Sequence, residues 1–256
     1  MLSHLNQHRI RAATIVAVLL LSASAFSKGR PAASTGGNGG IRGGDPIVEE
    51  AHMRMTALTQ AAPGDAAQGA QVLAALRTGL EPYADYHRAL ADGFTIFAPN
   101  LPQRVYHFSS RRRALVSAFH FNPAEPTSLL YEKTGDGYRL IGAMYTAPRW
   151  VSLAALNKRV PLSVAQWHEH INWCLPKAGQ MARLGERNAE GQPLFGGKGA
   201  IATEAECSAA GGRFIPQAFG WMLHVYPFAT NESDVWGREA MHEMAGDHGM
   251  GMKDSD

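Results

Sequence analysis

The segment from Pro161 to Cys174, PLSVAQWHEHINWC, constrains the fold of this chain most. Its aromatic and β-branched residues, and its short length before Pro176, favour a strand over a helix. In a strand alternate side chains share a face, so His168, His170 and Cys174 point to the same side. In a helix the two histidines would diverge by about 200° and could not bind one ion. The segment therefore predicts a strand that carries a pair of imidazoles.

A second segment of the same kind, residues 219–228, supplies His224. Three imidazoles are a common ligand set of zinc and copper sites, often with one coordination position open to water or substrate. We expect two strands to bring His168, His170 and His224 together around one metal ion, copper or zinc. His107, in another strand-like segment, is a fourth candidate ligand. The alternative is that these are ordinary core or surface histidines, because a His-x-His pair often arises by chance.

The carboxy-terminal segment, residues 237–256, contains four of the ten methionines and two histidines but no apolar periodicity. Thioether and imidazole ligands suit Cu(I) or Ag(I), whereas metals that prefer oxygen gain nothing from them. The composition resembles the Met/His-rich segments of exported copper-handling proteins. The alternative is a flexible tail without a chemical role.

The amino terminus has the features of a secretory signal. Residues 1–25 combine a basic start, a short apolar run and an Ala-x-Ala end. The run is too short to span a bilayer and no later segment is long enough, so no membrane insertion is expected after cleavage. Residues 26–44 form a glycine-rich linker, and residues 45–236 are predicted to form a single globular domain. We therefore expect a periplasmic or secreted protein.

The charge of the chain bears on its partners. Cleavage after residue 25 removes two of the 24 basic residues, which leaves 22 basic against 22 acidic residues. This balance argues against a nucleic acid or an anionic membrane as partner. The sequence predicts a metal ion as a partner and leaves protein partners open.

The chain has two cysteines, Cys174 and Cys207. In an exported protein the expected state is one disulfide between them. The alternative is that Cys174 is a thiolate ligand beside His168 and His170.

The order of patterns along the chain predicts the fold class. Three helices are expected first, over residues 45–60, 66–77 and 81–91. Patterns of period two follow, at residues 94–98, 105–108, 128–133 and 138–145, and then in the two histidine segments. The sequence therefore predicts an α+β fold in which amino-terminal helices pack on a mostly antiparallel sheet.

Several segments resemble a group of exported bacterial proteins. They are the Ala-Asp-Gly-aromatic sequence at residues 91–94, the aromatic-His sequence at residues 106–108, and a hairpin that ends at Tyr145. The resemblance covers roughly residues 80–230. The group has no assigned activity, so the resemblance implies export and no mechanism. Where the group has an acidic residue before the final tyrosine, this chain has Met144.

These observations leave three functions open. The favoured one is an exported metal-binding protein that handles copper. The second is a periplasmic metalloenzyme whose open zinc or copper site activates water or oxygen. The third is a module without metal, in which tryptophans line a ligand pocket. No Gly-x-Ser-x-Gly elbow, phosphate loop or dinucleotide fingerprint is present.

Overall fold

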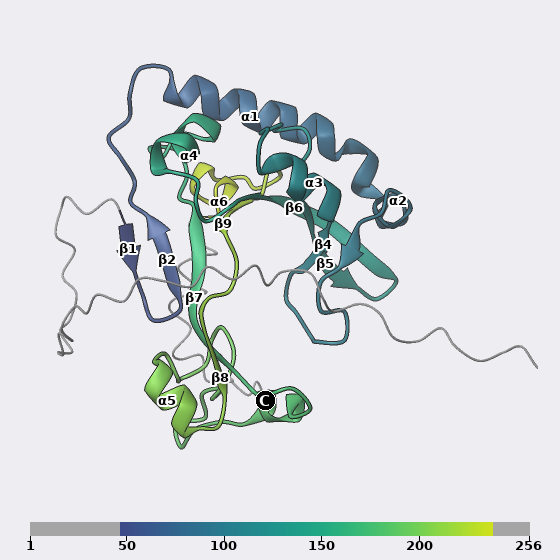
Figure 1. The fold of residues 1–256 in the computed structure, drawn as a ribbon. Coiled ribbons are helices and arrows are strands. Elements are labelled where there is room, and N and C mark those ends of the chain that lie inside the picture. Colours follow the sequence, from purple (N-terminus) through teal and green to yellow (C-terminus); the bar gives the residue numbers. More distant parts are fainter. Residues whose placement is uncertain (1–46, 238–256) are drawn as a thin grey trace, which may run out of the picture. The chain divides into compact units, whose positions relative to one another are not determined.

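The computed structural model describes residues 47–237 (Figure 1). The strands are β1 (Ile47–Glu49), β2 (Met53–Thr56), β3 (Thr95–Ile96), β4 (Tyr106–Ser109), β5 (Ser128–Thr134), β6 (Gly137–Ala147), β7 (His168–Leu175), β8 (Arg213–Gln217) and β9 (Trp221–Val225). The helices are α1 (Asp65–Leu80), η1 (Glu81–Ala84), α2 (Tyr86–Ala91), α3 (Arg111–Ser117), α4 (Leu153–Arg159), η2 (Met181–Gly185), α5 (Glu204–Ala209) and α6 (Glu232–Val235). The predicted signal, the linker and nearly all of the Met/His-rich tail lie outside the described residues.

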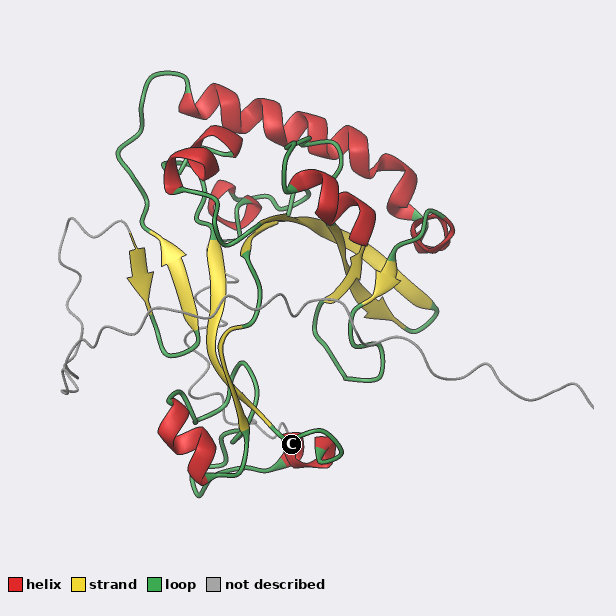
Figure 2. Ribbon diagram, viewed as in Figure 1, coloured by secondary structure: helices red, strands yellow, loops and turns green. Residues whose placement is uncertain are grey.

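The strands form one antiparallel sheet in the order β1-β2-β7-β9-β6-β5-β4-β3, and β8 also pairs with β7. The chain thus has a mixed α+β fold with a mostly antiparallel sheet. Figure 2 shows α1, α3 and α4 on one side of the sheet, whereas α5 lies beside the far end of β7 and β8. Within the described residues no helix is both long enough and apolar enough to cross a bilayer.

The main core lies between the sheet and the helices. Val72, Leu76 and Leu80 recur on one side of α1 and pack with buried residues of the sheet such as Tyr131 and Leu223. We call this side of the sheet the helix-covered face. Because side chains alternate along a strand, every second residue of the central strands points to the opposite face. The predicted ligands lie on that opposite face.

The predicted first helix, over residues 45–60, is wrong. Residues 47–56 form the β1–β2 hairpin, and β2 continues the sheet by pairing with β7. The physical reason is the spacing of Met53 and Met55. Both methionines are buried, whereas Arg54 between them is partly exposed. This burial pattern repeats every two residues, as in a strand, and not every 3.6, as in a helix. Within residues 47–237 a strand pair therefore precedes the helices, which are spread along the chain from α1 to α6.

The other predicted elements are close to the observed ones. The helix expected at 66–77 is α1, and the helix expected at 81–91 is divided at Asp85 into η1 and α2. The side chain of Asp85 accepts a hydrogen bond from the backbone N–H of His87 and so begins α2. The expected hairpin is β5–β6.

The predicted disulfide between Cys174 and Cys207 is present, with 5.5 Å between the two Cα atoms. It joins the end of β7 to α5, whose cap residue, Thr203, accepts a hydrogen bond from the backbone N–H of Glu206. Cys174 is therefore not a free thiolate, and the alternative that made it a metal ligand is wrong. A cross-link over a separation of 33 residues stabilises the fold by about 3 to 4 kcal/mol in the chain-entropy account.

Candidate functional site

The structure brings all four predicted histidines together. The ring centroids of His168 and His224 are 5.0 Å apart and nearly parallel, and those of His168 and His170 are 5.5 Å apart. The rings of His107 and His224 have their centroids 5.3 Å apart. Their Nε2 atoms are separated by 3.1 Å. Imidazoles from β4, β7 and β9 therefore form one cluster.

The register of the sheet explains the convergence of His168, His170 and His224, whereas β4, which carries His107, is separated from β9 by β6 and β5. His168 of β7 stands directly opposite Met55 of β2 and Met222 of β9. His224 follows two residues after Met222, so it points to the same face, and it stands opposite Met144 of β6. The strands that carry these residues are neighbours only because β9 lies between β7 and β6.

Burial keeps the four rings neutral. It lowers the pKa of His168 to about 3 and the pKa values of His107 and His170 to about 4. Burial also lowers the pKa of His224 well below its usual value, and the neighbouring imidazoles lower it further. A charged ring would lose its hydration and would repel a second charge on its neighbour. At neutral pH each ring therefore carries a lone pair on one nitrogen.

Several ring nitrogens have no protein partner. Both ring nitrogens of His168 and the Nδ1 atom of His224 are buried without a hydrogen bond in the described part of the chain. A buried polar group that lacks a partner costs about 1 to 3 kcal/mol. Such groups in a native protein call for an explanation, and an ion at the site is one of the usual ones.

The contact between His107 and His224 fits two arrangements. Separated by 3.1 Å, the two Nε2 atoms can share one proton in a hydrogen bond. They are also close to the separation of about 3.3 Å that two nitrogens have when both bind one tetrahedral ion at about 2.0 Å. The donor set thus fits copper or zinc, both of which accept imidazole ligands.

The four imidazole rings are not oriented toward one common metal position. Among residues 47–237, no group of three or more His, Cys, Asp or Glu side chains is arranged to hold a metal ion as it stands. Rotation of an imidazole about its terminal side-chain bond is soft, because this bond has a broad, roughly two-fold potential. Binding by three or four rings therefore requires rings to turn, while the strands that carry them can stay in place.

Methionines are the site residues that sequence reasoning missed. We call the following set the His/Met face: His107, His168, His170, His224, Met53, Met55, Met144 and Met222. The strand register places all eight on the side of the sheet opposite the helix-covered face. The signal that could have found them is a repeated spacing of two, as in Met53 and Met55 or in Met222 and His224.

The alternation predicted for β7 holds only up to Ile171. Asn172 has a φ of 56°, a left-handed conformation that breaks the alternation of the strand. Trp173, expected on the face opposite His170, instead has its ring 5.2 Å from that of His170. The ring of Phe219 lies 5.6 Å from that of Trp173. His170, which is only partly buried, therefore has an aromatic rim around its ring.

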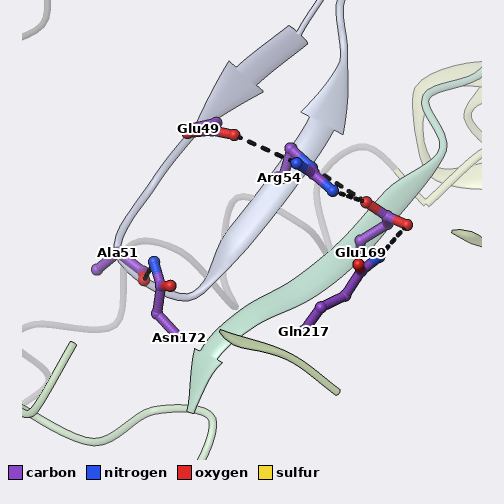
Figure 3. A network of polar contacts seen from close by, with 6 residues as sticks. All are labelled: Glu49, Ala51, Arg54, Glu169, Asn172 and Gln217. Atoms are coloured by element: carbon purple, nitrogen blue, oxygen red, sulfur yellow. Dashed lines mark hydrogen bonds and ion pairs between the residues drawn. The ribbon is translucent and has the colours of Figure 1, made fainter. Parts of the chain in front are cut away.

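Two other polar residues of β7, Asn172 and Glu169, have their side-chain hydrogen bonds with residues outside the histidine cluster. The amide of Asn172 donates to the backbone carbonyl of Ala51 (Figure 3). Glu169 is fully buried, and its carboxylate accepts hydrogen bonds from Arg54 and Gln217. Because Glu169 lies between His168 and His170 in the strand, it points away from both. Its charge is compensated by Arg54, and it is not a ligand candidate.

A cavity of about 320 Å³ is lined by residues between Ala57 and Asp65 and between Leu153 and Leu162. None of the four histidines and none of the tryptophans lines it. Trp167 and Trp221 instead belong to the main core. This cavity is therefore separate from the histidine cluster and does not provide the tryptophan-lined pocket of the third hypothesis.

Comparisons of the chain with protein-family models, curated proteins and solved structures found no match. Its function is therefore inferred from the residues of the site.

Proposed function

We propose that this is an exported metal-binding protein that holds one copper or zinc ion with the imidazoles of His107, His168, His170 and His224. The observation that carries the proposal is the 3.1 Å separation of the Nε2 atoms of His107 and His224 within a cluster of four neutral rings. Imidazole binds a metal only in its neutral form. Because burial lowers the pKa of all four rings well below neutrality, one nitrogen of each ring stays unprotonated at any physiological pH.

Binding is favoured over catalysis because the cluster has four rings and not three. Catalytic zinc sites have three protein ligands and leave the fourth position to water or substrate, whereas closed sites use all four. Four imidazoles can fill a tetrahedral shell without water. A closed coordination shell suits storage, transport or sensing of the ion. The metalloenzyme hypothesis instead requires one of the four rings to stay uncoordinated.

Export is supported by two independent features. The amino-terminal sequence has the pattern of a cleaved signal. The disulfide between Cys174 and Cys207 suits the periplasm or the extracellular space, where disulfides form and persist.

The proposal is tested on protein purified from its export compartment. The metal content is measured, and the metal-free protein is titrated with Cu²⁺ and with Zn²⁺ at pH 7. The fluorescence of Trp173 reports on binding, because its ring lies 5.2 Å from that of His170. We expect one ion per chain and quenching by Cu²⁺.

The test variant replaces His168 and His224 with Gln. Since a complete four-ligand site is worth about 10 kcal/mol or more, loss of two ligands lowers the affinity by about 100-fold or more. His170→Gln is a second test variant. It removes a ring that is only partly buried, so it is expected to fold even if the double variant does not. His120→Gln is the matched control, because His120 is exposed and outside the cluster. Equal metal affinity in all of these chains, or no binding by the wild type, contradicts the proposal.

A further inference from the structure

The methionines of the sheet all lie on one of its two faces. Five methionines fall within the described residues, and four of them belong to the His/Met face. The fifth, Met181, lies in η2 with 54% of its surface exposed. The buried residues of the main core, on the helix-covered face, include no methionine. Methionine is therefore not used in the described chain as a general filler of apolar space.

The methionines stand next to the histidines in the strand register. Met55 and Met222 are the two direct cross-strand neighbours of His168. Met144 is the direct neighbour of His224, and Met53 is that of His170. Directly opposed residues in an antiparallel pair have Cβ atoms about 4.5 to 5.5 Å apart, within reach of a flexible thioether. Three of the four predicted ligands thus have a sulfur-bearing neighbour.

The charge of this face also bears on the ion. None of its eight side chains is anionic when the imidazoles and thioethers are in their neutral forms. The nearby carboxylate of Glu169 is bound to Arg54 and points to the other side of the sheet. A buried cation held only by neutral ligands keeps its full charge, and the cost of burying that charge rises steeply with its size. The face therefore favours a monovalent ion over a divalent one.

We infer that the His/Met face selects a soft monovalent ion of the Cu(I) or Ag(I) class and that methionine thioethers bind it together with the imidazoles. This inference rests on the proposed function and deepens it. Soft thioether ligands favour Cu(I), whereas Zn²⁺ in proteins takes imidazole, thiolate and carboxylate ligands. The buried methionines of the sheet thus supply the same chemistry that composition suggested for the carboxy-terminal tail.

The experiment compares Ag⁺ with Zn²⁺ on the full-length chain. Ag⁺ serves as a stand-in for Cu(I) that is stable in air. The four tail methionines are replaced with Leu in every chain tested, so that the thioethers of the sheet are tested apart from those of the tail. Met55→Leu combined with Met222→Leu is the test variant, and Met181→Leu is the matched control. Exchange of Met for Leu conserves volume and is well tolerated in cores, and urea unfolding checks that each variant is folded.

We expect the Met55 and Met222 double variant to bind Ag⁺ at least tenfold more weakly and to keep its affinity for Zn²⁺ within twofold. The control should match the parent chain for both ions. If Zn²⁺ binds through the imidazoles but Ag⁺ affinity is the same in all chains, the inference is overturned while the proposed function stands. If the parent chain binds neither ion, both fail.

Discussion

Acid should destabilise this protein in a way that depends on the buried imidazoles. The pKa is about 3 for His168 and about 4 for His107 and His170, and it lies well below the usual value for His224. In the unfolded chain an imidazole takes up a proton with a pKa of about 6.5. Between pH 6.5 and about 4 the unfolded state therefore binds more protons than the folded state. The free energy of unfolding is highest above pH 6.5 and falls as the pH drops through this window.

The size of the effect follows from the difference between the two pKa values. A ring that stays neutral in the folded protein lowers the free energy of unfolding by about 2 kcal/mol at pH 5 relative to pH 8. The rings of His107, His168 and His170 together account for about 6 kcal/mol, and His224 adds to the loss in the same direction. Since the total stability of a domain is about 5 to 15 kcal/mol, the metal-free protein should be close to unfolding at pH 5.

The assay is urea denaturation of the metal-free protein at pH 8, 7, 6 and 5, followed by tryptophan fluorescence. In His168→Gln the loss of unfolding free energy between pH 8 and pH 5 should be about 2 kcal/mol smaller than in the wild type. His120→Gln, at an exposed position, should lose as much as the wild type. The reasoning is refuted if the wild type loses less than about 1 kcal/mol over this range, or if His168→Gln loses as much as the wild type.

Three further predictions concern other parts of the chain. Replacement of Cys174 and Cys207 with Ser should lower the free energy of unfolding by about 3 to 4 kcal/mol in urea denaturation, and no change would contradict the stabilising role of the disulfide. Arg54→Ala should cost about 3 to 5 kcal/mol because it leaves the buried carboxylate of Glu169 without its cation. Glu169→Gln in the Arg54→Ala chain should recover part of that loss, and a loss below about 1 kcal/mol in Arg54→Ala would mean that the ion pair is dispensable. Deletion of residues 241–256 should reduce copper uptake under reducing conditions without abolishing it, and unchanged uptake would leave the tail methionines without a role.

Local patterns predicted much of the fold, because they depend on residues near one another in the chain. The period-two segments became β4, β5, β6, β7 and β9. The expected hairpin formed from the segments at residues 128–133 and 138–145, which are β5 and β6. The expectation that His107, His168 and His224 approach one another rested on their strands lying close together in one sheet.

Other features depend on contacts between distant segments and could not be predicted from spacing alone. Residues 47–56 carry some helix-like spacing, yet pairing with β7 makes them strands. The strand order, with β9 between β7 and β6, comes from tertiary packing. The left-handed conformation of Asn172 breaks the alternation of β7 without a glycine to indicate it. The methionine neighbours of the histidines were missed for the same reason, since each methionine faces its histidine from an adjacent strand.

The central hypothesis is that imidazoles from separate strands bind one ion. Anomalous diffraction from crystals of the full chain loaded with Zn²⁺ tests it most directly. We predict an anomalous peak about 2.0 Å from the ring nitrogens of His107 and His224 and from at least one ring of β7. A peak found only on surface residues, with the hydrogen bond between His107 and His224 intact, would contradict it.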